Sequence, residues 1–373
     1  MVIEDRKIRV LVVDDSAVMR KLIPSLLDRE ETIEVVGTAI DGDFALNKLD
    51  QLRPDVVTMD VEMPRMDGLS ALKQIVARHS IPVVMLSSFT TRGAALTMKA
   101  LEIGAVDFIC KPKDHSQVDG MADELIAKVK AAAQARLINL RQTRPLDARA
   151  AGRAIGEARK KGAVRIAGKA TGRVVAIGAS SGGPHALRYL LPRIPADFGA
   201  GIVVVQHMPE SFTSMLAHWL NEICEVEVRE AVSGDIAFPG TVLIAPGNAH
   251  MKVVRKPLGP EVLIERSAPV NGHMPSVDVL FQSVAREYKD KAVGIILTGM
   301  GSDGAAGIGE MKRRGAHTIA QDRESCAIYG MPRVAVEKGF IERIVPLSEM
   351  AAYMISTVGR MDGLEAGTHA DIG

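Results

Sequence analysis

A serine in a tight, glycine-rich turn offers the most specific chemistry in this sequence. An apolar run leads into Gly178-Ala179-Ser180-Ser181-Gly182, which fits the pattern Gly-x-Ser-x-Gly, and a proline-led helical pattern follows. The small residues let the chain turn sharply from strand to helix, so that the Ser180 hydroxyl is exposed and a base can activate it as a nucleophile. The pattern is short, and a structural turn or a phosphate-binding loop remains an alternative interpretation.

Two further residues meet the other needs of a nucleophilic serine, which are a base and a group that orients the base. His207 follows the apolar run Gly201–Val205, and Asp303 follows the run Val293–Leu297. Because the carboxyl ends of parallel strands meet at one edge of a sheet, both residues are expected near Ser180. His207 would accept the serine proton and return it to the leaving group, while Asp303 would fix the imidazole tautomer.

Loops near these three residues offer oxyanion donors and rival bases. Backbone N–H groups near Ser181 or Met300 are the expected oxyanion donors. His250 and His273 also lie in predicted loops, and spacing alone excludes neither as the base. His273 precedes a predicted helix, where it could line a substrate cleft. The chain order Ser, His, Asp differs from the Ser, Asp, His order of α/β-hydrolases, which disfavours a lipase-like fold.

A second group of chemically active residues is acidic. Asp14 and Asp15 follow the apolar run Val10–Val13, and Asp60 follows the run Val56–Met59. Three carboxylates at one sheet edge repel one another unless a cation joins them, and Mg²⁺ suits that position because it prefers oxygen ligands. Taken singly, paired aspartates after a strand also serve as helix caps.

A hydroxyl and an ammonium group are expected at the same edge as the carboxylates. Ser87 ends the apolar run that begins at Val83, and Lys111 ends the next run. A metal ion and Lys111 would neutralise phosphate oxygens while Asp60 attacks phosphorus. The combination therefore favours phosphoryl transfer to Asp60.

Alternating strands and helices must position these two groups. In the first part of the chain, five apolar runs alternate with amphipathic stretches, which predicts a five-stranded, flavodoxin-like parallel sheet with helices on both faces. A second, Rossmann-like pattern of parallel strands follows, with a β-hairpin predicted around Pro257-Leu258-Gly259-Pro260. The predicted fold class is α/β with two doubly wound domains.

A basic segment, residues 128–172, separates the two patterns. Between residues 128 and 173 the chain has thirteen Lys and Arg residues against two Asp and Glu. This composition predicts a helical extension that becomes a flexible linker, either a solvated tether or a docking segment for an acidic partner. The small, polar residues 361–373 predict a loose tail. The predicted divisions are therefore 1–127, 128–172, 173–360 and 361–373.

Composition narrows the functional classes. The chain has 373 residues and a formal net charge of +1, so it has no global attraction to nucleic acid or to acidic membranes. It contains no run of about 18 apolar residues, and we expect no membrane insertion. The three widely spaced cysteines, Cys110, Cys224 and Cys326, are typical of a reducing cytoplasm and show no metal-ligand spacing.

The first pattern resembles a two-component receiver domain over roughly residues 6–125. The motifs that support this resemblance are Val12-Val13-Asp14-Asp15-Ser16, Met59-Asp60-Val61-Glu62-Met63-Pro64-x-Met66-Asp67-Gly68, Ser87 and Lys111-Pro112. The resemblance implies that a histidine kinase phosphorylates Asp60 with Mg²⁺ as cofactor. The implied metal ligands are carboxylates and one main-chain carbonyl, namely Asp15, Asp60 and the carbonyl of Glu62, with Asp14 nearby through water.

The same resemblance assigns three further residues. Ser87 and Lys111 would sense the phosphoryl group. Phe108 stands where receiver domains usually have a switch aromatic residue. These residues would connect the chemistry at Asp60 to the rest of the domain.

The second pattern resembles the catalytic domain of the chemotaxis protein-glutamate methylesterase family, CheB, over roughly residues 173–358. The motifs that support it are Gly178-Ala179-Ser180-Ser181-Gly182-Gly183, Gln206-His207-Met208-Pro209, Ala245-Pro246-Gly247-Asn248-x-His250-Met251, Pro275-Ser276-Val277-Asp278-Val279-Leu280-Phe281 and Leu297-Thr298-Gly299-Met300-Gly301-x-Asp303-Gly304. In that family the catalytic triad corresponds to Ser180, His207 and Asp303. Departures are small, with Ser181 in place of a common threonine and Ser302 in place of a common asparagine.

The CheB resemblance implies a substrate and a regulatory circuit. The substrate would be a glutamate γ-methyl ester on a methyl-accepting chemoreceptor, hydrolysed to glutamate and methanol, and receptor glutamines would be deamidated by the same chemistry. The receiver domain is expected to cover the active site until the histidine kinase CheA phosphorylates Asp60. Such an enzyme would act in the cytoplasm in chemotactic adaptation.

Two alternatives belong to other functional classes. A receiver domain also occurs in DNA-binding transcriptional regulators, but the second half shows no basic recognition-helix pattern. The glycine-rich segment Gly178–Gly183 could belong to a nucleotide-binding module, but it lacks both the Gly-x-x-x-x-Gly-Lys-Ser/Thr and the Gly-x-Gly-x-x-Gly spacing. The esterase interpretation is therefore favoured, with no nucleic-acid partner.

Overall fold

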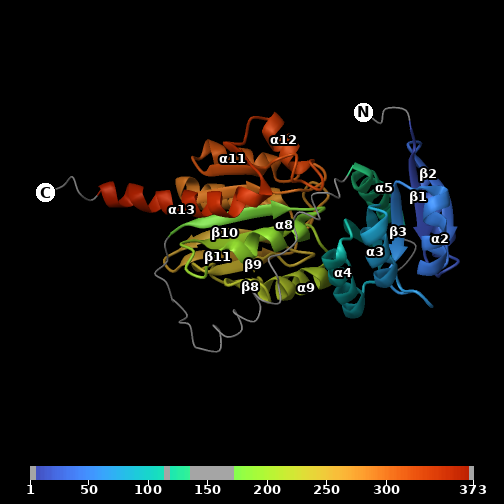
Figure 1. The fold of residues 1–373 in the computed structure, drawn as a ribbon. Helices are drawn as coiled ribbons and strands as arrows, with labels where there is room; N and C mark the ends of the chain where they lie inside the picture. The colour runs from blue at the N-terminus through green and yellow to red at the C-terminus, as the bar shows by residue number, and fades with distance from the viewer. Residues whose placement is uncertain (1–5, 113–117, 135–171, 369–373) are drawn as a thin grey trace. The chain divides into compact units, whose positions relative to one another are not determined.

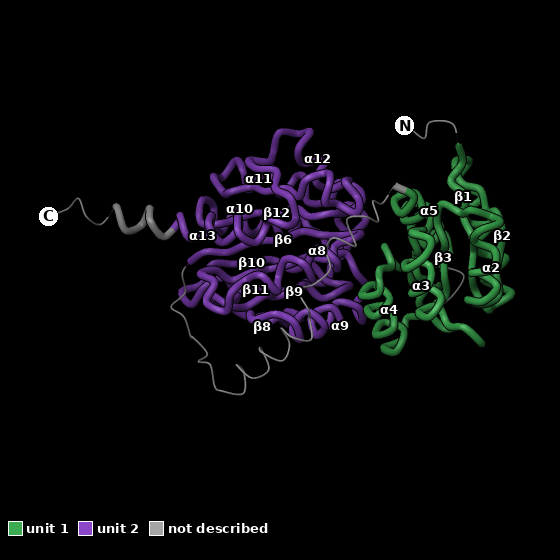
Figure 2. Tube along the Cα trace, viewed as in Figure 1, with its two compact units in different colours: residues 1–142 green, residues 143–373 purple. Residues whose placement is uncertain are grey.

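The computed structural model describes residues 6–112, 118–134 and 172–368. The chain divides into two compact units, residues 1–142 and residues 143–373 (Figure 2). Each unit is built on one parallel sheet with helices on both faces (Figure 1). The predicted α/β class with two doubly wound domains is confirmed.

The first unit has a five-stranded parallel sheet in the order β2-β1-β3-β4-β5. Helices α1 and α5 pack on one face, and α2, α3 and α4 pack on the other. The elements are β1 (Ile8–Val13), α1 (Met19–Leu27), β2 (Ile33–Ala39), α2 (Gly42–Leu52), β3 (Val56–Asp60), α3 (Gly68–Arg78), β4 (Val83–Ser87), α4 (Thr91–Ile103), β5 (Asp107–Cys110) and α5 (Val118–Gln134).

Burial and capping explain why these segments form the first unit. Every residue of β3, β4 and β5 is buried, as expected for strands covered on both faces. Three helices begin at a side chain that accepts a backbone N–H of the first turn: Asp41 for α2, Asp67 for α3 and Thr90 for α4. Such caps satisfy helix donors that have no partner within the helix.

The second unit has a seven-stranded parallel sheet in the order β14-β13-β12-β6-β7-β9-β8 and a separate antiparallel hairpin, β10-β11. Two short 3-10 helices also occur, η2 (Leu191–Arg193) and η3 (Lys289–Lys291). The other elements are β6 (Val174–Ala179), α8 (Gly183–Leu190), β7 (Gly201–Gln206), α9 (Glu210–Asn221), β8 (Glu227–Glu230), β9 (Thr241–Ile244), β10 (His250–Lys256), β11 (Gly259–Glu265), α10 (Val277–Tyr288), β12 (Ala292–Ile296), α11 (Ala305–Arg313), β13 (His317–Gln321), α12 (Met331–Glu337), β14 (Arg343–Val345) and α13 (Leu347–Thr368).

The main core of the second unit lies between the sheet and helix α10. Apolar side chains of β6, β7, β9 and β12 meet α10, α11 and α12 there, and the hairpin β10-β11 covers the far side of α10. The Ser283 hydroxyl of α10 accepts the backbone N–H of Val253 at 2.9 Å, which ties the hairpin to the helix. Helices α8, α9 and α13 cover the opposite face of the sheet.

Both sheets have a switch point beside their first strand. In the first unit, β1 lies between β2 and β3, so successive crossovers leave it in opposite directions. In the second unit, β6 lies between β7 and β12 in the same way. Ligand sites of open α/β sheets lie beyond the carboxyl ends of the strands at such points. Asp14 follows β1, and Ser180 follows β6.

The structure differs from the sequence predictions at five places. Strands β8, β13 and β14 were not predicted, because they are short and rich in charged or polar residues. The hairpin turn is shorter than predicted, since Lys256 already pairs with Gly259. Helix α13 continues to Thr368, so residues 361–368 are helical where a loose tail was predicted, and this stretch contains the helix formers Met, Leu, Glu and Ala.

The segment predicted to be a linker begins inside a helix. Helix α5 continues to Gln134, which agrees with the predicted helical extension of the first domain. Residues 135–171, the rest of that segment, lie outside the described residues. Within the described ranges, no helix combines the length and the apolar character that crossing a bilayer requires.

Candidate active site

The Ser180 turn is shaped by glycines at both ends of Gly-x-Ser-x-Gly. A side chain at position 178 would overlap with Val277 of α10. Gly182 has φ = +77°, a conformation that favours glycine, and it begins helix α8. The backbone N–H of Ser180 donates to Thr298 O at 3.1 Å, so the turn is fixed against the loop that follows β12.

Ser180 lies between the loops that hold His207 and Asp303. Strands β6 and β7 pair up to Ala179 and Gln206, and the N–H of His207 donates to Ala179 O at 3.1 Å. The residues after these two strands are therefore neighbours. On the other side, a Cβ atom at Gly299 would lie 2.8 Å from Ser180 Cβ, so only a glycine lets the two loops come this close.

The His207 imidazole is hydrogen-bonded to Asp303. Nε2 lies 2.9 Å from Asp303 Oδ2, and both side chains are buried. This contact fixes Nε2 as the protonated nitrogen, because a carboxylate accepts. The other nitrogen, Nδ1, is buried and has no hydrogen-bond partner among the described residues. In the neutral imidazole this second nitrogen carries no proton and is the one that can accept one.

Asp303 accepts a dense set of hydrogen bonds. Besides His207, four groups donate to its two oxygens: the N–H of Val277 (2.7 Å), Ser276 Oγ (2.8 Å), Asn271 Nδ2 (3.0 Å) and the N–H of Asp278 (3.3 Å). Burial alone would raise the pKa of Asp303, but the bonds from His207, Asn271 and Val277 outweigh it and hold this pKa well below its usual range. Asp303 is therefore an anion at every physiological pH.

The two rival histidines have different positions. His250 is buried, its Nε2 lies 3.1 Å from Ala268 O, and its Nδ1 accepts the N–H of Ser276 at 3.1 Å. With both nitrogens engaged, His250 has no free site for a substrate proton. His273 stacks on His207 instead, with ring centroids 3.9 Å apart and planes at 8°. His273 thus lies beside the proposed base, and its predicted place in a substrate cleft stays a prediction.

The predicted oxyanion residues lie on either side of Ser180. Ser181 is buried, and its carbonyl accepts Thr298 Oγ1 at 3.0 Å. Met300 follows Gly299, whose carbonyl accepts the N–H groups of Gly330 and Met331 at 3.1 and 2.8 Å. The structure thus brings both backbone segments to the Ser180 turn.

Two supporting residues were not predicted from the sequence. Gln206 donates from Nε2 to Ser180 O at 2.9 Å and lies 3.2 Å from His207 O, so it joins the two loops. Asn271 donates to Asp303, as described above. The dipeptide Asn271-Gly272 favours a tight turn. This sequence signal could have predicted that the loop has a defined geometry.

In the first unit, the three predicted carboxylates meet at the switch point. Asp14, Asp15 and Asp60 each offer an oxygen within 4.8 Å of the others. Lys111 Nζ lies 2.8 Å from Asp14 Oδ2 and 2.7 Å from Asp60 Oδ2. A side chain at Gly68 would overlap with Asp60 O, so that glycine is required for the loop after β3. Such hard oxygen donors around a partly neutralised pocket fit a divalent cation such as Mg²⁺.

Electrostatics at Asp60 make this carboxylate bind a proton more tightly than an ordinary aspartate does. Burial raises the pKa of Asp60 to about 6, and the charges of Asp14 and Asp15 add to this effect while Lys111 opposes it. Burial lowers the pKa of Lys111, but its carboxylate neighbours more than compensate, so the net shift is upward. Lys111 is therefore protonated and positively charged at this site.

The other predicted receiver residues are close to this cluster or on the strands beside it. Ser87 is buried, and its Oγ accepts Thr97 Oγ1 of α4 at 2.7 Å. The side chain of Glu62 is exposed and pairs with Arg92 at 3.0 Å. Phe108 is buried beneath Lys128, whose Nζ lies 5.1 Å from the ring centroid and donates to Phe108 O at 2.6 Å.

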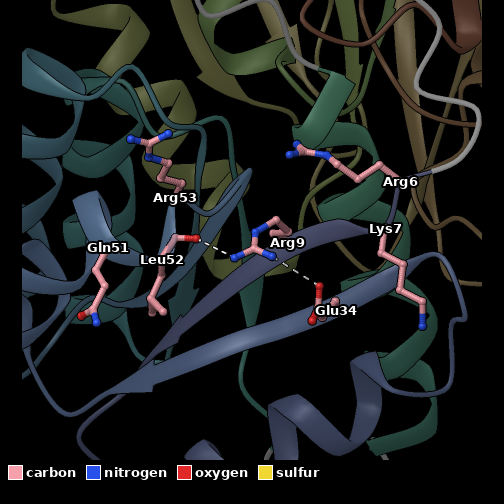
Figure 3. Close-up of a pocket in the computed structure, with 7 residues that line it drawn as sticks. All are labelled: Arg6, Lys7, Arg9, Glu34, Gln51, Leu52 and Arg53. Atoms are coloured by element: carbon pink, nitrogen blue, oxygen red, sulfur yellow. Dashed lines mark hydrogen bonds and ion pairs between the residues drawn. The ribbon is translucent and has the colours of Figure 1, made fainter.

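A basic hollow lies at the opposite edge of the first sheet. It encloses about 430 Å³ near the amino ends of β1 and β2 (Figure 3). Arg9 crosses it, with Nη1 3.6 Å from Glu34 Oε2 and Nη2 donating to Leu52 O at 2.8 Å. The hollow is separate from the carboxylate cluster. It is lined by Arg6, Lys7, Arg9, Glu34, Gln51, Leu52 and Arg53.

Comparison with known families assigns each half of the chain to a known domain family. The family model described as CheB methylesterase matches residues 175–354, and the response regulator receiver domain matches residues 10–123. A protein-glutamate methylesterase/protein-glutamine glutaminase of Koribacter versatilis is 49% identical over 92% of this chain and 94% of its own length. The chain belongs to the CheB methylesterase family.

Two further proteins are similar to all or part of this chain. The protein-glutamate methylesterase/protein-glutamine glutaminase of Symbiobacterium thermophilum is 46% identical over 95% of this chain and 98% of its own length. The crystal structure of the Thermotoga maritima CheB methylesterase catalytic domain is 38% identical, covers 50% of this chain and 98% of its own, and gives a TM-score of 0.49. Because the second half matches a methylesterase, a receiver-linked DNA-binding regulator is not supported.

Proposed function

We propose that this CheB protein is a phosphorylation-activated serine esterase that hydrolyses glutamate γ-methyl esters on methyl-accepting chemoreceptors and deamidates specific receptor glutamines. The observation that supports it most is the buried His207–Asp303 pair beside the Ser180 turn, in which none of the described residues bonds to the second imidazole nitrogen. The names of its relatives support the same activity.

In the proposed first step, Ser180 Oγ attacks the ester carbonyl carbon while His207 Nδ1 takes the hydroxyl proton. Asp303 stabilises the imidazolium that forms and holds it in one orientation. Backbone N–H groups near Ser181 and Met300 bind the oxyanion of the tetrahedral intermediate. When the intermediate collapses, the C–O bond to methanol breaks and His207 returns the proton to the departing methoxide.

In the second step, water hydrolyses the acyl-enzyme. His207 accepts a proton from the water molecule as the water oxygen attacks the acyl carbon. The bond between the acyl carbon and Ser180 Oγ then breaks, and His207 passes the proton to Ser180 Oγ. The product is the free glutamate side chain. With a glutamine substrate the leaving group is ammonia, and the remaining steps are the same.

The receiver half is proposed to control this chemistry. Asp60 would accept a phosphoryl group from the histidine kinase CheA. Asp15, Asp60 and the Glu62 main-chain carbonyl would hold Mg²⁺, with Asp14 nearby through water, and the ion would supply positive charge for the phosphoryl oxygens. Ser87 and Lys111 would hold the phosphoryl group. Phe108 of β5 would act as the switch aromatic residue that changes position when Asp60 is phosphorylated. A phosphoryl group adds nearly two negative charges and can shift a local equilibrium.

The proposed division of labour follows the predicted boundaries. Residues 1–127 form the receiver domain, residues 128–172 connect it to the enzyme, and residues 173–360 form the methylesterase domain. We place its site of action in the cytoplasm, where its chemoreceptor and kinase partners expose their signalling parts.

The test is methanol release from methylated chemoreceptor membranes, with and without a small-molecule phosphodonor. We expect Ser180→Ala to lower the rate at least about 10³-fold while phosphorylation of Asp60 stays normal. Ser214→Ala, which removes an exposed hydroxyl on α9, serves as the matched control and should keep the wild-type rate. Wild-type turnover in Ser180→Ala would refute the nucleophile assignment.

A further inference from the structure

One four-residue turn presents two side chains to the His207–Asp303 pair. Val270 and His273 exchange backbone hydrogen bonds at 3.0 and 2.9 Å, and both residues between them have positive φ, +53° at Asn271 and +77° at Gly272. This is the geometry of a type I′ turn, which Asn-Gly favours. The turn carries the His273 ring that stacks on His207.

The Asn271 side chain joins two carboxylates. Its Nδ2 lies 2.7 Å from Asp278 Oδ2 and 3.0 Å from Asp303 Oδ1, so one amide nitrogen donates to both groups. Asp278 is buried at the start of α10, and its other oxygen accepts the N–H of Gly307 at 2.6 Å. An NH₂ group has the two donors that this arrangement needs.

Two buried carboxylates this close would repel each other without a donor between them. Asp303 is a full anion, and its charge, together with burial, raises the pKa of Asp278. The charged and titratable groups that face Asn271 are Asp278 of α10, Asp303 of the loop after β12 and, through the stack, His273 and His207. Among the donors to these two carboxylates, Asn271 Nδ2 is one that both of them share.

We infer that Asn271 is a positioning residue for catalysis, because its amide orients Asp303 toward His207 and separates it from Asp278. Asp303 uses Oδ2 for His207 and Oδ1 for Asn271, so the amide limits rotation of the carboxylate about its Cβ–Cγ bond. A rotated carboxylate would misplace the imidazole, and small errors of position at reacting atoms cost rate rather than substrate binding. This inference rests on the proposed esterase activity.

The turn allows a test that removes the amide and keeps the backbone. Glycine tolerates positive φ and Gly-Gly also forms type I′ turns, so Asn271→Gly retains the turn. We expect kcat for methanol release to fall about 10- to 100-fold with KM within about twofold of wild type. Asn271→Asp replaces the NH₂ donor by an oxygen of similar shape and adds a third carboxylate, so its kcat should fall further than that of Asn271→Gly.

Asn248→Gly is the matched control. Asn248 also has positive φ (+59°), but its amide reaches the exposed Glu210 at 3.4 Å rather than Asp303. Full-length proteins with unchanged thermal unfolding midpoints, a kcat loss confined to the two Asn271 variants and an unchanged KM support the inference. A wild-type kcat in Asn271→Gly overturns it, and so does an equal loss in Asn248→Gly or a loss that falls mainly on KM.

The same assay tests the proposed esterase activity separately from the role of Asn271. Methanol release by wild type that is lost in Ser180→Ala keeps the proposed function, whatever Asn271→Gly does. If wild type releases no methanol, the proposed function fails, and the positioning role of Asn271 fails with it.

Discussion

Two buried aspartates, one in each half of the chain, show opposite electrostatic behaviour. Asp60 is 6% exposed and Asp303 is 1% exposed. The pKa of Asp60 is raised to about 6, whereas that of Asp303 lies well below its usual range. Asp60 is the last residue of β3 and Asp303 lies in the loop after β12, and each of these strands lies beside the first strand of its sheet. Burial and fold position are therefore similar, and the surrounding groups decide the direction of the pKa shift.

The difference lies in the donors around each carboxylate. Asp303 accepts hydrogen bonds from one imidazole, one amide, one hydroxyl and two backbone N–H groups. Asp60 has two acidic neighbours and one ammonium group, Lys111. A carboxylate saturated with donors stays ionised and can steady a neighbouring imidazolium. A carboxylate among other carboxylates needs a cation, and this makes it responsive to metal and phosphate.

The largest effect is expected from a change at Asp303, the carboxylate that accepts many hydrogen bonds. Asp303→Asn keeps the shape of the side chain but removes the charge that fixes the His207 tautomer, so we expect kcat for methanol release to fall about 10³- to 10⁴-fold. Steady-state kinetics on methylated receptor membranes measures this. Asp290→Asn, an exposed change in η3, is the control and should have the wild-type kcat. A loss smaller than tenfold in Asp303→Asn would contradict the proposed role of the carboxylate.

The next largest effect is expected from a change that disables the phosphorylation site at Asp60 and leaves the esterase site intact. Asp60→Asn cannot accept a phosphoryl group, so the phosphodonor should no longer stimulate methanol release, while the unstimulated rate stays the same. Coupling between two sites is typically worth about 5- to 150-fold, and this is the stimulation expected to disappear. Stimulation that persists in Asp60→Asn would show that control does not pass through this residue.

Removal of divalent cations sharpens the same contrast. A chelator should stop phosphorylation of Asp60, because the three carboxylates then have no cation among them beyond Lys111. The unstimulated esterase rate should not change, since donors already occupy both oxygens of Asp303. Radiolabelled phosphoryl transfer and methanol release, measured on the same sample, test this, and added Mg²⁺ should restore phosphorylation. A chelator that stops the unstimulated esterase would undo the contrast.

The smallest expected effect concerns stability. The pKa of Asp60 in the folded state, about 6, lies above its usual 3.8, so between these pH values the folded chain binds this proton more tightly than the unfolded chain. Stability therefore falls as the pH rises through this window and stays lower above it. Asp60→Asn avoids that loss and should stabilise the first unit by about 2 kcal/mol at pH 8, with no gain below about pH 4.

Calorimetry of the full chain without Mg²⁺, followed through the transition of the first unit, measures this stability effect. Asp123→Asn, an exposed change on α5, is the control and should show no comparable gain at pH 8. Destabilisation of the first unit by Asp60→Asn at pH 8 would contradict the assigned electrostatics.

The sequence predicted the site residues at strand ends better than the residues that hold them in position. In the second unit Ser180 and His207 each follow a clear apolar run, and in the first unit Asp14 does so too. Parallel strands of one sheet bring such ends together, so the neighbours within each unit could be predicted. Asn271 and Gln206 act through contacts with loops far away in the chain, and no local pattern encodes those contacts. Strand β8 (Glu227–Glu230) escaped prediction because an edge strand with charged residues lacks the apolar signal.

The central claim is that hydroxyl, imidazole and carboxylate act as one unit in the second half of the chain. The most direct test is a mutant cycle of His207→Ala, Asp303→Asn and the double variant, with kcat for methanol release as the readout. If Asp303 acts only through His207, the double variant should match His207→Ala within about threefold. A double variant whose loss equals the product of the two single losses would contradict the account.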